Sequence, residues 1–460
     1  MKNKHFHFIG IGGAGMSGIA RIMLAQGIKV SGSDAKESMV TTQLETLGAK
    51  IFIGHDAANQ IDSDVVVVSS AISANNPELT SARDRGAEIM PRANALALVM
   101  QGKRSVAVAG THGKTTTTSM LTVALQKAGL DPSFAIGGMI NNSGTNAHLG
   151  SGDIFVAEAD ESDGSFLSYL PSGAIITNLE LDHVDHFPDL PTLMDAFLKF
   201  INSIAKDGFL VTCGDDRNIE ELLASGVRSD LTVIRYGKEN PANDFQISRV
   251  HLSEDAGLCR IVHKGKVLGE LSLSIPGEHN LLNATAALAA AYALQVPLPD
   301  IFGGLHEFSG ARRRFELKGK INDIRVIDDY GHHPTEVKVT LETARRYAAG
   351  GKVFVVFQPH RYSRTKMFAQ RFGEALELAD QIYLLEVYAA SEEPIPGVSS
   401  LLIMQGRSAE KFHYEPSMIE VIGSIAEKVA PGDVVLTLGA GDVNSLGPVI
   451  LTAIGERFAL

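Results

Sequence analysis

The sequence has few cysteines and no long apolar run. Its 2 cysteines, Cys213 and Cys259, cannot form a disulfide framework and lack the spacing of zinc ligands, so we expect reduced thiols. No stretch reaches the roughly 18 apolar residues of a membrane-spanning helix. The first residues, MKNKHFHFIGIGGAG, carry glycines within their apolar run, unlike a signal peptide. These absences predict a cytoplasmic protein that does not contact membranes.

An excess of positive charge is also lacking. The chain has 41 lysines and arginines against 53 aspartates and glutamates, and this net charge of −12 argues against broad binding to nucleic acid or anionic membranes. Local basic pockets for phosphates remain compatible with it. The length of 460 residues fits about three domains. The sequence shows no internal repeat and no low-complexity tract.

Short apolar runs alternate with amphipathic segments, which is typical of parallel α/β layers. We place the domain boundaries near residues 103 and 315, giving domains of residues 1–102, 103–314 and 315–460. The strands that carry this prediction are His5–Ile9, Lys29–Ser31, Val65–Ser69, Ser105–Ala109, Ile154–Ala157, Ala174–Thr177, Ile324–Ile327, Val353–Phe357, Gln381–Leu385 and Val434–Leu438. The fold class is therefore α/β.

The segment SVAVAGTHGKTTTT reads as a strand, a glycine turn and a helix. Backbone N–H groups around Gly110 and Gly113 can cradle a polyphosphate. Lys114 would then reach the outer phosphates, and the Thr115 hydroxyl would bind Mg²⁺. Val108 stands where the strict P-loop pattern has a glycine, and a glycine turn with a surface lysine is the alternative. We predict a nucleoside triphosphate site here.

A second glycine cluster, FIGIGGAGMSGIA, also follows a strand and opens a helix. It fits a dinucleotide or nucleoside diphosphate site, with the diphosphate at the helix N-terminus and Asp34 near the ribose. Tight helix–strand packing without a ligand is the alternative. Ser69 and Ser70 follow a later strand and offer a second phosphate-facing loop.

Acidic residues follow two strands of the central section. Glu158 begins the run EADESD, and His183 ends NLELDH. Carboxyl ends of parallel strands are where open α/β sheets bind ligands, and carboxylate oxygens suit a hard cation. A solvated acidic loop is the alternative for either segment alone. His183 and His186 have no cysteines nearby, so structural zinc is disfavoured.

The last section supplies cations and polar residues of the kinds an acyl-phosphate reaction uses. Arg314 follows a turn, and DDYGHHPTE follows a predicted strand. Arg361 and Arg364 follow another strand and are suited to bidentate capture of a carboxylate. Surface decoration is the alternative for each residue.

Ten motifs occur in one order: FIGIGGAGMSGIA, SGSD, VSSAIS, GTHGKTTTT, EADESD, TNLELDH, PGEHNLLNA, DDYGHHPTE, FQPHRYSRT and GAGD. Together they resemble the Mur ligases of bacterial cell-wall synthesis, over residues from about 5 to about 445. The resemblance implies an N-terminal Rossmann-like UDP-sugar domain, a central P-loop ATPase-like domain and a C-terminal Rossmann-like domain. It also implies the alanine-adding reaction, with UDP-N-acetylmuramate, L-alanine and ATP as substrates and Mg²⁺ as cofactor. We expect a monomer or weak homodimer.

The resemblance assigns roles residue by residue. Catalysis falls to Lys114, Glu158, His183 and Arg314, and Mg²⁺ to Thr115, Glu158 and His183. The implied ATP site is Gly110, Thr111, His112, Gly113, Lys114, Thr115, Thr116, Asn280, Asn283, Arg314 and Asp329. The implied UDP-sugar site is Gly12, Gly13, Ala14, Gly15, Asp34, Ser69 and Ser70. The muramyl carboxylate and alanine would be surrounded by Tyr330, His332, His360, Arg361 and Arg364.

Three alternatives stay open at this point. A tripeptide-adding ligase acting on the same sugar is the nearest, although FIGIGGAGMSG and VSSAIS favour the alanine-adding branch. An NAD-dependent dehydrogenase would leave GTHGKTTTT without a role, and a regulatory nucleotide-binding module would not need Lys114, Glu158 and His183. Lys199 is the nearest candidate for the carbamylated lysine of several relatives. The role of Asp442, in GAGDVNSLGP, is not assigned.

Overall fold

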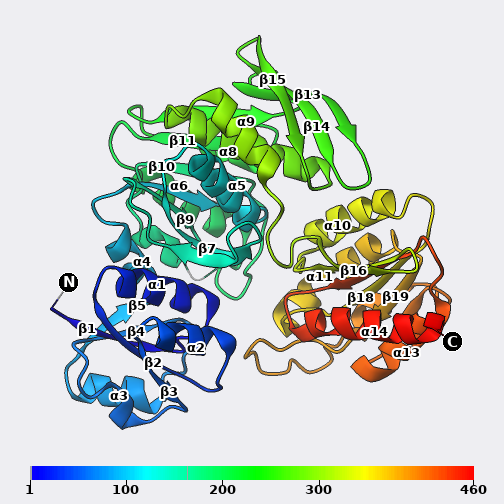
Figure 1. The fold of residues 1–460 in the computed structure, drawn as a ribbon, viewed down its shortest axis with the longest axis horizontal. Helices are drawn as coiled ribbons and strands as arrows, with labels where there is room; N and C mark the ends of the chain where they lie inside the picture. The colour runs from blue at the N-terminus through cyan, green and yellow to red at the C-terminus, as the bar shows by residue number, and fades with distance from the viewer. Residues whose placement is uncertain (1–2, 163, 460) are drawn as a thin grey trace.

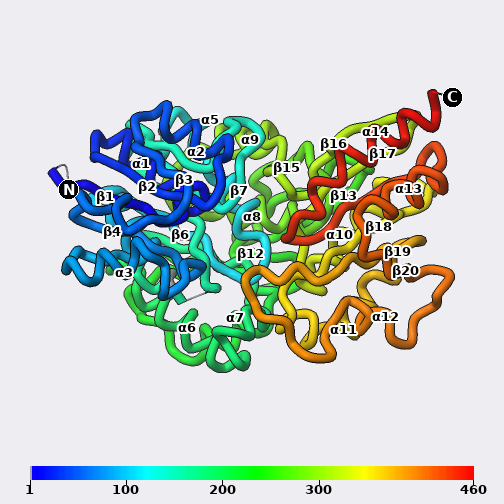
Figure 2. The backbone as a smooth tube through the Cα atoms, turned by 90° about the horizontal axis from the view of Figure 1, so that it is seen from below, coloured from blue at the N-terminus to red at the C-terminus, as the bar shows by residue number. Residues whose placement is uncertain are grey.

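The computed structural model describes residues 3–162 and 164–459 and consists of three α/β regions, each built on its own sheet. The N-terminal and C-terminal regions lie apart, and the central region joins them (Figure 1). Seen from below, the two chain ends lie at opposite sides of the molecule (Figure 2). Asp163, the last residue of EADESD, lies outside the described residues.

The N-terminal region is a parallel sheet of 5 strands in the order β3-β2-β1-β4-β5. Its strands are β1 (His5–Ile9), β2 (Lys29–Asp34), β3 (Lys50–Ile53), β4 (Val65–Val68) and β5 (Glu88–Pro91). Its helices are α1 (Ala14–Ala25), α2 (Met39–Thr46), the 3₁₀ helix η1 (Ala57–Gln60), α3 (Pro77–Asp84) and α4 (Arg92–Met100). The order turns back at β1 and β4, so their carboxyl ends open a crevice where such sheets bind ligands.

The central region is a sheet of 10 strands in the order β15-β14-β13-β12-β11-β10-β6-β9-β7-β8. Its strands are β6 (Arg104–Ala109), β7 (Ser133–Ile140), β8 (Thr145–His148), β9 (Ile154–Glu158), β10 (Gly173–Ile176), β11 (Phe209–Cys213), β12 (Thr232–Gly237), β13 (Phe245–Leu252), β14 (Gly257–His263) and β15 (Lys266–Leu273). Its helices are α5 (Lys114–Lys127), η2 (Ser165–Ser168), α6 (Leu190–Ser203), α7 (Arg217–Ala224), α8 (Glu278–Ala293) and α9 (Leu298–Glu307). Strands β7, β9, β6, β10, β11 and β12 pair in parallel around the phosphate loop. The edge strand β8 pairs antiparallel with β7, and β13, β14 and β15 form an antiparallel extension.

The C-terminal region is a sheet of 6 strands in the order β16-β17-β21-β18-β19-β20, parallel except for β16. Its strands are β16 (Glu316–Ile321), β17 (Ile324–Asp329), β18 (Val353–Phe357), β19 (Gln381–Leu384), β20 (Phe412–Tyr414) and β21 (Val434–Leu438). Its helices are α10 (Pro334–Tyr347), α11 (Tyr362–Leu376), α12 (Leu401–Met404), α13 (Met418–Lys428), η3 (Asp442–Ser445) and α14 (Leu446–Ala459).

The three regions do not share their cores equally. One hydrophobic cluster runs from the N-terminal sheet into the central sheet, because α1 packs against β7 and β8. The C-terminal sheet has clusters of its own on its two faces: Val355 belongs to one, and its neighbours Phe354 and Val356 belong to the other. Successive side chains of a strand point to opposite faces, which explains this division. At the candidate site, the C-terminal region contacts the central region through hydrogen bonds and ion pairs.

The strands predicted from apolar runs are confirmed as β1, β2, β4, β6, β9, β10, β17, β18, β19 and β21. The antiparallel extension and the short edge strands were not predicted. Strands β13, β14 and β15 of this extension mix buried residues with partly and fully exposed ones, so they lack the continuous apolar runs of the buried strands. Within the described residues, no helix combines the length and apolarity needed to cross a membrane.

Candidate active site

The phosphate loop joins β6 to α5 as the sequence predicts. Gly110 has φ +125°, and a Cβ there would lie 2.2 Å from Thr177 Oγ1. Gly113 has φ +81°, and a Cβ there would lie 2.6 Å from Asn283 Oδ1. Both positions therefore combine a left-handed backbone with close neighbours, which only glycine accommodates without strain. The turn brings α5 to the carboxyl end of the sheet with Lys114 at its start.

Lys114 lies among carboxylates and carbonyls. Its Nζ donates to Gly110 O at 2.7 Å, to Thr111 O at 3.3 Å and to Glu161 Oε1 at 2.8 Å. Burial by itself lowers the pKa of Lys114, but Glu161 and Asp160 outweigh this effect and raise it. The lysine is therefore a fixed cation. A phosphate at the loop would compete with Glu161 for it.

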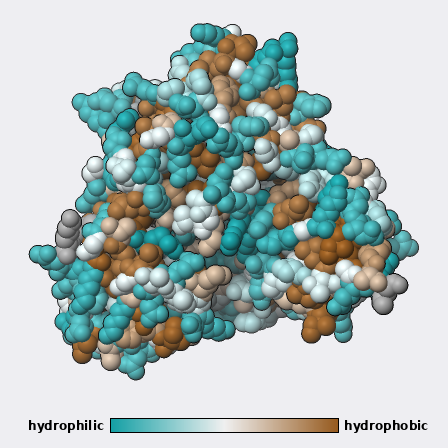
Figure 3. Space-filling view, in the orientation of Figure 1, coloured by the Kyte–Doolittle hydropathy of each residue, from teal (hydrophilic) through white to brown (hydrophobic). Residues whose placement is uncertain are grey.

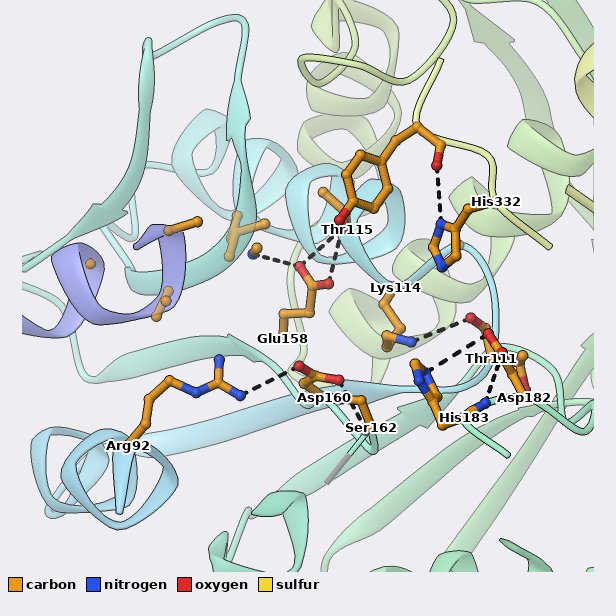
Figure 4. A pocket seen from close by; sticks show the side chains of 18 of the residues that line it. Arg92, Thr111, Lys114, Thr115, Glu158, Asp160, Ser162, Asp182, His183 and His332 are labelled. Carbon is orange, nitrogen blue, oxygen red and sulfur yellow. Dashed lines mark hydrogen bonds and ion pairs between the residues drawn. The ribbon is translucent and has the colours of Figure 1, made fainter. Parts of the chain in front are cut away.

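Thr115 and Glu158 form the predicted metal-ligating pair. The Thr115 hydroxyl lies 2.9 Å and 3.1 Å from the two oxygens of Glu158, which also accepts from Gly137 N at 2.6 Å. Arg314, from the far end of the central region, reaches Thr115 Oγ1 at 3.4 Å. Figure 4 shows Thr115 and Glu158 side by side. These hard oxygen donors are the type that Mg²⁺ prefers.

His183, the third predicted metal ligand, lies beside Glu161. Its Nε2 is 3.6 Å from Glu161 Oε1 and 3.9 Å from Asp182 Oδ2. Burial lowers the pKa of His183, but the neighbouring carboxylates outweigh this effect and raise it. Among the described residues, the other carboxylate oxygen of Glu161, Oε2, is buried without a hydrogen-bond partner. An unpartnered carboxylate oxygen next to an imidazole fits a divalent cation, so Glu161 joins the candidate ligands.

A cavity of about 360 Å³ brings residues from all three regions together. Several predicted residues line it: Ala14, Gly15, Thr111, Gly113, Lys114, Thr115, Glu158, His183, Arg314, Tyr330, His332, His360, Arg361 and Arg364. The surface between the N-terminal and C-terminal regions is hollowed and largely hydrophilic (Figure 3). The residues predicted to hold the muramyl carboxylate and alanine therefore share a cavity with the phosphate loop.

Arg364 is more restricted than its sequence position indicates. Its Nε and Nη2 donate to Asp182 Oδ1 at 3.0 and 2.9 Å, and Nη1 lies 3.2 Å from His360 Nδ1. Burial raises the pKa of Asp182, but Arg364 outweighs it and holds that pKa far below its usual range. Arg361 has φ +70° and pairs with Asp185 at 2.5 Å. Both arginines thus join the C-terminal region to the central region.

Two histidines in the cavity are neutral near pH 7. Burial, with Arg364 nearby, lowers the pKa of His332 to about 3. Burial also lowers the pKa of His360, with His332 and Arg364 adding to the shift. His332 Nδ1 lies 3.0 Å from Tyr330 O, a carbonyl that can only accept. Nδ1 therefore carries the proton, and Nε2 of His332 is left as an acceptor.

A second cavity of about 320 Å³ lies on the other side of the phosphate loop. Predicted ATP-site residues line it: His112, Gly113, Thr116, Asn280, Asn283, Arg314 and Asp329. Burial raises the pKa of Asp329 to about 6, and its carboxylate accepts from Phe315 N and Gly331 N, both at 2.8 Å. Apolar side chains such as Ile275 and Phe308 complete the lining, which suits an adenine ring beside polar phosphate contacts.

The predicted UDP-sugar residues lie at the carboxyl edge of the N-terminal sheet, but only Ala14 and Gly15 reach the first cavity. Asp34 Oδ2 accepts from Gly12 N at 2.9 Å and so fixes the glycine turn. The cavity lining does not include Gly12, Gly13, Asp34, Ser69 or Ser70.

Sequence reasoning missed several residues of the cavity. Arg92, at the start of α4, lines it and pairs with Asp160 at 3.4 Å (Figure 4). Asp160 and Asp182 also line it and stand inside the acidic motifs, so these motifs already contained the signal, whereas nothing marked Arg92. Lys199 is exposed on α6 and lines neither cavity. Asp442 is exposed and accepts from Gln358 at 2.7 Å, so it fixes the loop after β21.

Three α/β regions meet at a phosphate loop and a shared polar cavity, an arrangement that suits an ATP-dependent ligase. Family models for the Mur ligase family catalytic domain, the Mur ligase middle domain and the Mur ligase glutamate ligase domain match residues 5–104, 108–291 and 313–441. This chain belongs to the Mur ligase family. Mur ligases use ATP and generally need a divalent metal ion.

Relatives within the family cover nearly the whole chain. UDP-N-acetylmuramate–L-alanine ligase of Renibacterium salmoninarum is 50% identical over 453 residues, which cover 97% of this chain and 95% of that protein. The enzyme of the same name from Acidothermus cellulolyticus is 48% identical over 458 residues, covering 98% and 95%.

Solved structures agree with this placement. UDP-N-acetylmuramate-alanine ligase from Thermotoga maritima has a TM-score of 0.82 at 30% identity and covers 99% of both chains. A murein peptide ligase from Psychrobacter arcticus has a TM-score of 0.75 at 28% identity, covering 98% of this chain and 99% of its own.

Proposed function

We propose that this chain is the ATP-dependent ligase that joins L-alanine to the lactyl carboxylate of UDP-N-acetylmuramate in peptidoglycan precursor synthesis. The single observation that carries the proposal is the first cavity, where the phosphate loop meets Tyr330, His332, His360, Arg361 and Arg364. The relatives named UDP-N-acetylmuramate–L-alanine ligase, at 48% and 50% identity over almost the full length, support the same reaction. The match of all three regions to the Mur ligase family does not support the dehydrogenase or the regulatory-module alternative.

Each region has a proposed task. Residues 1–102 bind the UDP-sugar through Gly12, Gly13, Ala14, Gly15, Asp34, Ser69 and Ser70. Residues 103–314 bind ATP through the phosphate loop, with the adenine near Asn280 and Asn283. Residues 315–460 bring Asp329 to the ribose and the cavity residues from Tyr330 to Arg364 to the acceptor. This division follows the three sheets.

The first step is phosphoryl transfer to the sugar's carboxylate, which gives an acyl phosphate and ADP. Lys114 and Arg314 lie beside the phosphate loop and neutralise charge on the transferred group. Thr115, Glu158, His183 and Glu161 would hold Mg²⁺, which supplies further charge neutralisation when bound. The contact between Glu161 and Lys114 must break before Lys114 can bind the transferred phosphoryl group.

The second step is attack by the amine of alanine on the acyl carbon, with release of phosphate. His332 Nε2 is an acceptor and is suited to orient the amine, while Arg361 can pair with the alanine carboxylate. The cavity draws residues from all three regions, so closure of these regions around the substrates would limit the access of water to the acyl phosphate.

The test is phosphate release from ATP with UDP-N-acetylmuramate present and each amino acid added in turn. The proposal predicts release with alanine well above the other amino acids. A tripeptide such as L-Ala-γ-D-Glu-meso-diaminopimelate serves as the matched competitor, because the murein peptide ligase fold is also similar. Turnover with the tripeptide and none with alanine would reassign the chain to the tripeptide-adding branch.

A further inference from the structure

His112, in the phosphate loop, bridges two carboxylates from different regions. Its Nε2 lies 3.3 Å from Glu180 Oε2, in the central region, and its Nδ1 lies 3.2 Å from Glu336 Oε1, in the first turn of α10. The side chains of His112 and Glu336 are each 14% exposed. One imidazole thus connects the nucleotide loop to the C-terminal region.

Glu180 is hydrogen-bonded both to the phosphate loop and to the C-terminal region. Glu180 is tied to the phosphate loop through Thr111, whose Oγ1 accepts from Glu180 N at 2.8 Å. The side chain of Glu180 accepts from Thr335 Oγ1 and from Arg371 Nη2, both at 2.6 Å, and both donors belong to the C-terminal region. His112 and Glu180 therefore form one junction that faces α10 and α11.

The junction carries a proton at neutral pH. Burial lowers the pKa of His112, but its contacts with Glu180 and Glu336 outweigh burial and raise the pKa to about 9. The ring of His333 lies 4.8 Å away, centre to centre, and burial with His112 nearby lowers the pKa of His333 to about 4. Among the described residues, the other groups that face the junction are Arg371 on Glu180, Asp182 near His333, and the neutral His332 and the cationic Arg314 beside Glu336. His112 is thus its titrating cation.

A metal ion is the competing occupant. Ligand atoms of His112, Glu180 and His333 lie within 4.8 Å of one another. A metal would require His112 to lose a proton that its hydrogen bond to Glu180 and its ion-pair contact with Glu336 favour, and Arg371 already balances the charge of Glu180. Nδ1 of His333 also accepts the N–H of Thr335 at 3.3 Å. The contacts therefore favour a proton over a metal.

Glu336 extends the connection from His112 to the first cavity. Its Oε2 accepts from the backbone N–H of His332 at 2.9 Å and of His333 at 3.2 Å. Tyr330 and His332 of the same turn line the cavity beside Lys114. One carboxylate therefore lies between His112 of the phosphate loop and the backbone that carries His332.

We propose that His112 is a positioning residue: it holds the turn of residues 330–336 against the phosphate loop, so that the acceptor side of the cavity stays aligned with the nucleotide. This role rests on the proposed ligase function. The C-terminal region has separate hydrophobic cores, so polar contacts of this kind decide how firmly it closes on the central region.

The test compares His112→Asn, Glu336→Gln and the double variant with wild type. Glu342→Gln, on the same helix α10, is the matched control, since Glu342 has no hydrogen bond or ion pair among the described residues. We expect kcat/KM for alanine to fall about 10-fold or more in both single variants, by a clearly larger factor than ATP affinity falls. If the two residues act as one unit, the double variant loses no more than the worse single variant.

Small-angle scattering of the full chain gives a readout that does not depend on ligase chemistry. Wild type should stay compact at pH 7 and expand above about pH 9, where His112 loses its proton. His112→Asn should be expanded at both values, and Glu342→Gln should follow wild type. Circular dichroism confirms that each variant is folded.

Each outcome decides one question. Wild-type compactness and alanine kinetics in folded His112→Asn and Glu336→Gln would overturn the positioning role. Loss of ATP affinity alone would make His112 a nucleotide contact instead, and stoichiometric Zn²⁺ binding at pH 7 that His112→Asn abolishes would make the cluster a metal site. Absence of alanine-dependent phosphate release in wild type would contradict the ligase function and leave the scattering result interpretable.

Discussion

The guanidinium of Arg364 holds the carboxylate of Asp182 through two N–H donors, and these side chains are only 4% and 5% exposed. The pair spans the C-terminal and central regions and lies in the wall of the candidate acceptor cavity. Arg361, three residues earlier, makes its ion pair with Asp185 at side chains that are 30% and 43% exposed. Two arginines that look equivalent in the sequence are therefore in different environments.

We expect these two arginines to respond differently to substitution by alanine. Removing one partner of a buried ion pair costs about 3–5 kcal/mol, so Arg364→Ala should lower both the melting temperature and activity. Exposed pairs contribute about 0–1 kcal/mol, so Arg361→Ala should leave melting nearly unchanged. If Arg361 binds a substrate carboxylate, the KM of the Arg361→Ala variant for alanine or UDP-sugar should rise about 30-fold or more, while its affinity for ATP stays unchanged.

Arg361→Lys is the companion variant and should recover only part of the loss, because lysine cannot make two parallel hydrogen bonds. Separate titrations of ATP, alanine and UDP-sugar distinguish the substrates. Weakened ATP binding with unchanged KM for alanine and sugar would move Arg361 to the nucleotide site.

Replacing Lys114 tests the phosphate loop. Lys114→Ala should reduce ATP-dependent ligation by at least about 100-fold, because a preorganised cation next to the transferred phosphoryl group is lost. Lys127→Ala is the control: Lys127 lies at the end of the same helix α5 and pairs with Glu307 at an exposed site. Steady-state phosphate release measures both variants. Near-normal turnover by folded Lys114→Ala would show that the loop does not bind the phosphates.

Metal dependence tests the carboxylate pair. Wild type should need Mg²⁺ and lose activity in excess chelator, and Glu158→Ala should lose at least about 100-fold because an oxygen ligand and the Thr115 contact disappear. Titrating Mg²⁺ against rate separates weakened metal binding from lost turnover. Full wild-type activity in chelator contradicts the site, and Glu221→Gln, at an exposed carboxylate on α7, controls for a general charge effect.

Acid sensitivity should arise in part from Glu78, far from the cavity. Glu78 is fully buried and contacts His7 at 3.0 Å, Ser33 at 2.7 Å and Asn59 at 2.8 Å. Burial raises the pKa of Glu78, but these partners outweigh it and lower the pKa. A carboxyl whose pKa is lower in the folded state stabilises fully above its unfolded pKa, about 4.3, and loses that contribution as pH falls through the folded value.

Urea unfolding of wild type and Glu78→Gln from pH 7 to pH 3 measures this contribution. The variant should be less stable by about 3 kcal/mol at pH 7, and the gap should narrow below about pH 4. A gap that stays constant to pH 3 would show that the Glu78 carboxylate contributes no charge-dependent stability.

Local sequence signals determined the strands, the glycine turns and the chemistry of the phosphate loop. Apolar runs such as Val353–Phe357 form buried strands wherever a parallel sheet can cover them, and the glycines at 110 and 113 mark backbone that other residues adopt only with strain. The order of the motifs indicated the family. These features depend on neighbours within a few residues, so they can be read from the chain.

Partner choice among distant charged residues was decided only by the tertiary structure. Asp182 and Arg364 are 182 positions apart, and Lys114 and Glu161 are 47 apart, yet each pair is in contact. No local pattern predicts that Arg364 pairs with a protein carboxylate, that Lys114 pairs with Glu161, or that His112 pairs with Glu336. The reason is physical: a charge is paired by whatever the folded sheets bring within a few ångströms, and burial then sets its strength.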